Sequence, residues 1–176
     1  MALTGHYTAT CSTARSGGVA TLYLIDAADV TSMTKGSGVT SYATIALATA
    51  KHFWTNSFDE DTCEWRENVE GEKGLFTITQ EIEWMEAGLS LAQRNHLAEL
   101  MASSVCGMIA IVKDGTGLYW VIGYDDQNGK ARPLKLVTAP KTTAKLFADP
   151  AVGTTITLRR TTNELAHNTT ASIVIA

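Results

Sequence analysis

The sequence is short of charged residues, and its charge balance leaves no basic surface. Charged side chains make up 18% of the 176 residues, against about 25% in an average globular domain. A net charge of −4 provides no basic face with which to hold nucleic acid phosphates. The one adjacent basic pair, Arg159 and Arg160, lies in a predicted strand, where the two side chains point to opposite faces. Specific binding of nucleic acid is therefore not expected.

Cysteine is scarce and irregularly spaced. The three cysteines, Cys11, Cys63 and Cys106, form no CxxC pair, so we expect neither a disulfide framework nor a cysteine metal site, and a reducing compartment during synthesis. Cys106 stands between a predicted helix and a predicted buried strand, and we expect it to be a small core residue. The sequence also shows neither a signal peptide nor a transmembrane span, so we expect no membrane association.

Motifs for catalysis are missing as well. The glycines at 36–38 and 115–117 do not form GxGxxG, and neither GxxxxGK[ST] nor GxSxG occurs. His96 with Glu99 is not an HExxH site, and we expect a solvated histidine on a helix. The acidic run at 59–64 lacks the glycine and the ligand spacing of a calcium loop. We therefore expect no enzyme activity, no cofactor and no metal.

The best-specified part of the chain is residues 75–124, which read strand, helix, strand, strand. Alternation over 75–84 places the side chains of Phe76, Ile78, Ile82 and Trp84 on one face of a strand. Residues 107–112 and 117–123 are two further apolar strands. The Asp-Gly pair at 114–115 is a strong hairpin signal between them.

One helix is predicted, from Leu91 to about Ser103. Ser90 and Gln93 have the spacing of a capping box at its start. Leu97, Leu100 and Met101 then fall near one face, so we expect an amphipathic helix that covers a sheet.

The remaining segments favour further strands joined by polar loops. Strands are expected at 21–26, 39–50, 134–137, 154–160 and 171–175; loops are expected at 26–40 and 138–150, with a polar turn at 125–130. The fold class is therefore mainly β (α+β): a β-barrel or β-sandwich of about eight strands with one α-helix packed against it, forming a single domain over 1–176.

Residues 51–74 are harder to interpret. Four aromatic side chains, Phe53, Trp54, Phe58 and Trp65, stand among polar and acidic residues. We interpret the stretch as an extended arm or hairpin whose aromatic side chains contact other subunits. An ordinary hairpin whose tryptophans complete the core is an equally acceptable interpretation.

The order of these elements resembles the tail tube proteins of tailed bacteriophages and their relatives in contractile injection systems. The resemblance rests on the strand at 75–84, the helix at 90–104 and the strands at 108–112 and 118–123. The stretch from His52 through Glu67 is also similar to structural proteins of Bacteroidetes-type phages.

The resemblance implies a virion structural protein, made in the host bacterial cytoplasm and located in the tail. Such subunits form stacked, usually hexameric, rings whose sheets join around a channel, and loops and terminal arms reach adjacent rings. DNA passes through a commonly acidic lumen without specific binding, with which the net charge of −4 is compatible. Partners would be copies of the same chain and other tail proteins such as a terminator, a tape measure or a baseplate. We expect Phe53, Trp54, Phe58, Trp65 and the loop at 29–38 to make subunit contacts, and both chain ends to dock.

Two alternatives stay open. The first is a tail terminator, neck or head–tail connector protein with the same kind of fold. The second is a β-sandwich carbohydrate-binding module, which would use Trp54 and Trp65 as exposed aromatic platforms.

Overall fold

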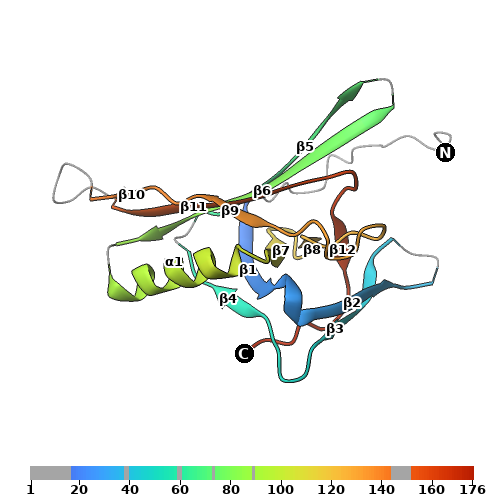
Figure 1. The fold of residues 1–176 in the computed structure, drawn as a ribbon, viewed down its shortest axis with the longest axis horizontal. Helices are drawn as coiled ribbons and strands as arrows, with labels where there is room; N and C mark the ends of the chain where they lie inside the picture. Colours follow the sequence, from blue (N-terminus) through green and yellow to red (C-terminus); the bar gives the residue numbers. More distant parts are fainter. Residues whose placement is uncertain (1–16, 38–39, 59–60, 73, 89, 144–151) are drawn as a thin grey trace.

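A computed structural model describes residues 17–37, 40–58, 61–72, 74–88, 90–143 and 152–176. Within these residues the chain forms twelve strands in two sheets, one α-helix and one short 3-10 turn (Figure 1). The predicted mainly β class with one helix is confirmed. The sheets do not form a closed barrel, and the strands outnumber the eight expected.

The larger sheet has seven strands in the order β2-β3-β12-β8-β7-β1-β4. All neighbours are antiparallel except β12 and β3, which are parallel. The strands are β1 (Val19–Asp26), β2 (Val30–Lys35), β3 (Tyr42–Leu47), β4 (Trp54–Asn56), β7 (Met108–Asp114), β8 (Tyr119–Ile122) and β12 (His167–Thr169); η1 (Ala27–Asp29) joins β1 to β2.

The smaller sheet has five strands around one long central pair. β11 (Gly153–Thr162) pairs with β6 (Leu75–Ala87) over ten residues, and β5 (Glu64–Glu72) pairs with the other edge of β6. The free edge of β11 is shared by β9 (Lys135–Thr138) and β10 (Lys141–Thr142). Side chains 78, 80, 82, 84 and 86 of β6 are all buried, as strand alternation predicts.

Two apolar cores lie on opposite faces of β7. The first fills the space between the sheets and includes Trp84 of β6, Leu158 of β11 and Ala110 of β7. The second includes Ile109 and Ile111 of β7. It also holds residues from both ends of the larger sheet, namely Val30, Met33 and Phe53, so this sheet is rolled around its own core.

The helix α1 (Leu91–Ser103) begins as predicted. Ser90 Oγ accepts a hydrogen bond from Gln93 N (3.2 Å), and the Gln93 side chain accepts one from Ser90 N (2.8 Å), which completes a capping box. The predicted apolar face is only partly used, because Leu100 is buried and Met101 is 59% exposed. α1 is therefore anchored by few side chains rather than by a continuous apolar stripe.

Three sequence predictions are wrong in detail. Residues 30–35 are expected in a loop, but they form β2, in which a register shift between Val30 and Ser32 allows both Val30 and Met33 to enter the second core while Thr31 and Thr34 are exposed. The last strand is β12 rather than 171–175, and Ile175 makes a single bridge to Phe53. Cys106 is exposed rather than buried, because it lies in the turns that follow α1.

Candidate functional site

The β5–β6 hairpin reaches well beyond the body of the protein (Figure 1). The pairing of β6 with β11 ends at Ile78, so residues 75–77 pair with β5 alone. Residues 68–72 and 74–77 are all exposed. Three of these side chains are large and apolar, namely Val69, Leu75 and Phe76, and Leu75 is 81% exposed. We call residues 68–72 and 74–77 the hairpin tip.

The four predicted contact residues do not share one surface. Phe53 is fully buried in the second core. Phe58 and Trp65 are half-buried against the first core, where the ring of Trp65 lies 5.5 Å from that of Trp120. Trp54 is 62% exposed. Of the four, Trp54 therefore offers the most surface to a partner.

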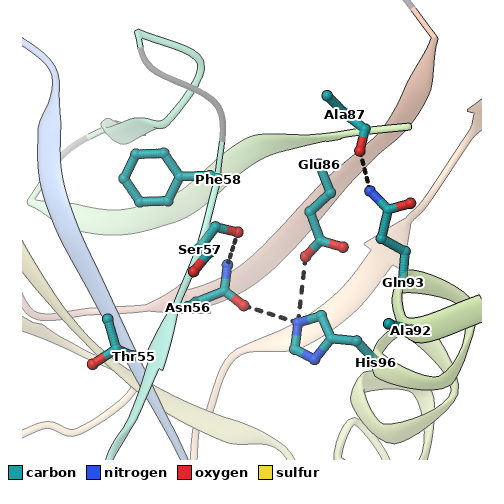
Figure 2. A pocket seen from close by; sticks show the side chains of 9 residues that line it. All are labelled: Thr55, Asn56, Ser57, Phe58, Glu86, Ala87, Ala92, Gln93 and His96. Carbon is teal, nitrogen blue, oxygen red and sulfur yellow. Dashed lines mark hydrogen bonds and ion pairs between the residues drawn. The ribbon is translucent and has the colours of Figure 1, made fainter. Parts of the chain in front are cut away.

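His96 is held between three elements instead of being free in solvent, as Figure 2 shows. From α1 its Nε2 lies 2.8 Å from Asn56 Oδ1 on β4 and 3.3 Å from Glu86 Oε1 on β6. Glu86 is buried and also accepts a hydrogen bond from Trp84 Nε1 (3.1 Å). The prediction of a solvated helix histidine is wrong, because these partners lie 40 and 10 residues away in the sequence.

The electrostatics of this junction favour a charged imidazole. The hydrogen bond that the imidazole donates to Glu86 raises the pKa of His96, against an opposing effect of burial, and the negative charges of Glu86 and Glu99 add to the increase. Nε2 faces two oxygen acceptors and therefore carries a proton. The imidazole therefore links α1 to both sheets. We call His96 and its two partners, Asn56 and Glu86, the His96 clasp.

Two hollows flank this clasp. The smaller, of about 420 Å³, lies between β4, the end of β6 and the first turns of α1, and includes Phe58 and Gln93 (Figure 2). The larger, of about 640 Å³, lies on the other side of Asn56 and His96. We call it the helix-side cleft; it is lined by Leu24, Ile25, Asp26, Asp29, Trp54, Thr55, Asn56, His96, Glu99, Leu100, Ser103 and Met108.

A second polar cluster joins the β2–β3 hairpin to the loop that follows β8. Ligand atoms of Asp126, Glu164 and His167 lie within 4.8 Å of one another. The ammonium group of Lys35 contacts the Asp126 carboxylate and lies 3.3 Å from His167 Nε2. Tyr42 also donates a hydrogen bond to Asp126 (3.0 Å). A lysine therefore already supplies the positive charge that a metal would bring.

The adjacent Asp125 forms a buried ion pair that ties the two sheets together. Its Oδ1 lies 2.7 Å from Arg160 Nη2, and its Oδ2 accepts a hydrogen bond from Thr162 Oγ1 (2.6 Å). Both charged side chains are 1% exposed. The prediction that Arg159 and Arg160 point to opposite faces is confirmed, since Arg159 is half-exposed and pairs with Glu81.

Sequence reasoning missed most members of these clusters. Glu86, Asn56, Glu164 and Lys35 carry no motif, and their partners are distant in sequence. Pairing register is what brings them together, and no local pattern encodes it. Of the acidic run at 59–64, residues 59 and 60 lie outside the described part of the chain.

Comparison with protein-family models, with curated proteins and with solved structures found no match to this chain. Among the described residues, α1 is too short and too polar to cross a bilayer, and no other helix is a candidate.

Proposed function

We propose that this chain is a structural subunit that assembles with copies of itself into stacked rings, as in the tube of a bacteriophage tail. The observation that carries the proposal is the bare hairpin tip. It combines free strand edges with large apolar side chains, and within the described residues nothing covers it.

An isolated two-stranded hairpin is marginally stable in water. Exposed strand edges are normally shortened, charged or covered, because they pair readily with another chain. Here the tip carries Val69, Leu75 and Phe76 in the open. A neighbouring subunit that buries these three side chains would stabilise both the hairpin and the contact.

Exposed apolar side chains also occur along α1. Three large side chains in and just after α1, namely Leu91, Met101 and Val105, are exposed. Figure 1 places α1 away from the hairpin tip, toward the opposite end of the long axis. The hairpin tip and α1 are two different elements with exposed apolar side chains, which suits a head-to-tail contact, in which one copy binds the next through unlike surfaces.

In this proposal the partners are further copies in the ring and the stack, then other tail proteins such as a terminator, a tape measure or a baseplate. DNA would pass along the channel without specific binding, and the protein would be located in the virion tail. The described chain supports this reading through the absence of any motif for chemistry and through its uncovered apolar surfaces.

Negative-stain electron microscopy of the purified protein tests the proposal. We expect rings or tubes from the native chain. The triple variant Val69→Ser, Leu75→Ser, Phe76→Ser should shift the population to free subunits or single rings. Leu118→Ser is a matched control, because Leu118 is also exposed at a hairpin turn but belongs to the body.

A strict monomer at high concentration would contradict the proposal. A single ring that never stacks would instead favour the terminator, neck or connector role. If the triple variant forms tubes as readily as the native chain, the hairpin tip is not part of the contact, although self-assembly itself is retained.

A carbohydrate-binding module remains a second candidate because Trp54 is exposed beside the helix-side cleft. Aromatic faces of this kind can stack on sugar rings. A glycan screen with the native chain and with Trp54→Ala tests it. If no glycan binds in a way that depends on Trp54, the carbohydrate-binding function is excluded.

A further inference from the structure

The helix-side cleft combines carboxylates, an apolar floor and an exposed tryptophan. Its volume of about 640 Å³ is in the range of small-molecule sites. The floor includes Leu24, Leu100 and Met108, each at most 6% exposed. Such a floor can bury an aliphatic chain, but it has no group that could pair with a charged part of a ligand.

The charges around the cleft are unevenly compensated. Asp29 pairs with Lys51 (3.0 Å) and His96 pairs with Glu86 (3.3 Å), so these groups are already neutralised. Asp26 and Glu99 have no hydrogen bond or ion pair within the described residues, and they come from different walls, β1 and α1. Glu99 acts on His96, whose pKa it helps to raise, but the lining holds the three carboxylates of Asp26, Asp29 and Glu99 and neither lysine nor arginine, so the cleft is negative overall.

Trp54 supplies a third recognition element. Its side chain is 62% exposed at the cleft, and His52 packs edge-on against it with ring centroids 4.5 Å apart. The face of an indole ring attracts a cation within about 6 Å. An exposed tryptophan beside unpaired carboxylates is a suitable receptor for a positively charged organic group.

We propose that the helix-side cleft binds an ammonium or guanidinium group carried on an aliphatic chain. The carboxylates of Asp26 and Glu99 would attract the charge, the apolar floor would take the chain, and Trp54 would lie against the cationic end. A lysine or arginine side chain of another protein and a free organic amine share this chemistry. A bare metal ion is a poorer match, because the described residues gather three metal-ligating groups within 4.8 Å at Asp126, Glu164 and His167 and not here.

Fluorescence titration tests the proposal, because Trp54 is the most exposed of the four tryptophans and lies at the cleft. The probes are agmatine as the free amine and N-acetyl-lysine methylamide as the peptide side chain. N-acetyl-norleucine methylamide is the neutral control, since it keeps the chain and lacks the ammonium group. We expect saturable changes in fluorescence and protection of Trp54 from acrylamide quenching, with a Kd on the order of 1 mM for the cations, weakened by salt.

The double variant Asp26→Asn, Glu99→Gln should weaken binding of the cations at least about tenfold, a change of roughly 1.4 kcal/mol. Within the described residues neither carboxylate has a hydrogen bond or ion pair to lose, so the fold should be retained, as thermal unfolding will check. Asp61→Asn, Glu64→Gln changes two exposed positions outside both the cleft and the hairpin tip; it removes the same charge elsewhere and should leave affinity unchanged.

Three results would overturn the proposal: no saturable binding of either cation up to about 20 mM, equal binding of the norleucine control, or an unchanged affinity in the Asp26, Glu99 double variant. Preference for the peptide probe over agmatine would identify a protein side chain as the source, and the reverse would identify a free amine. Ring assembly is measured separately, so failure here leaves the proposed function untouched.

Discussion

The protein contains two hairpins that are built in opposite ways, β7–β8 and β5–β6. β7 is buried on both faces, and its turn is fixed by Asp114, which accepts hydrogen bonds from Thr116 N (2.8 Å), Leu118 N (3.0 Å) and Trp120 Nε1 (2.8 Å). β5–β6 is longer, but its tip is exposed and its last residues pair only with each other.

The difference shows that the length of a hairpin does not determine how much it contributes to the core. The short hairpin holds both cores together and leaves little for a partner. The long hairpin contributes to the first core only through its inner half, from Ile78 inward. Its outer half adds surface without adding burial, which is expected of a contact segment and not of a core segment.

The sharpest test of this contrast truncates one apolar side chain in each hairpin. Ile111→Ala removes a fully buried side chain of β7 and should lower the free energy of unfolding by about 2–5 kcal/mol. Phe76→Ala, at the hairpin tip, should change it by less than about 0.5 kcal/mol. Urea unfolding monitored by circular dichroism measures both.

Equal losses in the two variants would break the comparison, because Phe76 would then be part of the folded core of the single subunit. The measurement needs dilute protein, since self-association would itself stabilise the native chain.

The turn of β7–β8 provides a test of intermediate size. Burial alone would raise the pKa of Asp114, but hydrogen bonds from Thr116, Trp120 and Leu118 outweigh it and hold its pKa below the usual range. The stabilisation is present above the unfolded pKa of about 3.9 and is lost as the pH falls through the lower folded value. Because Asp114 is half-exposed, we expect Asp114→Ala to cost about 1 kcal/mol at pH 7.

That cost should shrink as the pH falls through the lowered folded pKa of Asp114, where the native aspartate also becomes neutral. Thr116→Val, which removes one donor, should cost less than Asp114→Ala. A pH-independent difference between the native chain and Asp114→Ala would show that the carboxylate charge is not what fixes the turn.

The smallest effect is expected at the His96 clasp, which connects α1 to the ends of β4 and β6. Its pKa is raised above the ordinary value, so its stabilisation is full below about pH 6.5 and is lost as the pH rises through the folded pKa. The side chain is 36% exposed, and solvent screening limits the effect to about 0.5 kcal/mol. His96→Gln should remove this pH dependence, as thermal unfolding at pH 6 and pH 8.5 would reveal.

An unchanged dependence on pH in His96→Gln would assign the titration to another group. His167 is the natural comparison, since it is also partly buried and lies against carboxylates. The variant His167→Gln therefore serves as the control for His96→Gln.

The sequence predicted those structural features that depend on residues close together in the chain. The capping box of Ser90 and Gln93, the Asp-Gly turn at 114–115 and the alternation in β6 are all confirmed, because each depends on residues a few positions apart. The fold class followed from the same local patterns.

The sequence did not predict which residues far apart in the chain pair with each other. β2 has the composition of a loop, and only its place on the second core makes it a strand. The Asp125–Arg160 ion pair and the His96–Asn56 contact join residues 35 and 40 positions apart, and register alone brings them together. Whether Phe53, Trp54, Phe58 and Trp65 contact other subunits stays a prediction, although Phe53 is a core residue. Residues 1–16, at the end of the chain that was expected to dock, lie outside the described residues, whereas Ala176 N donates a hydrogen bond to Phe53 O of its own chain (3.1 Å).

The position of β12 has a consequence for the order in which the chain can fold during synthesis. β12 lies between β3 and β8, so the β2–β3 hairpin is attached to the rest of its sheet through residues 167–169. Thr169 meets Tyr42 across 127 positions of sequence. A ribosome must therefore have translated residues 167–169 before the early hairpin finds its neighbour in the sheet. Until then the hairpin that carries Val30 and Met33 of the second core lacks its neighbouring strand, so this part of the sheet completes its pairing late in synthesis.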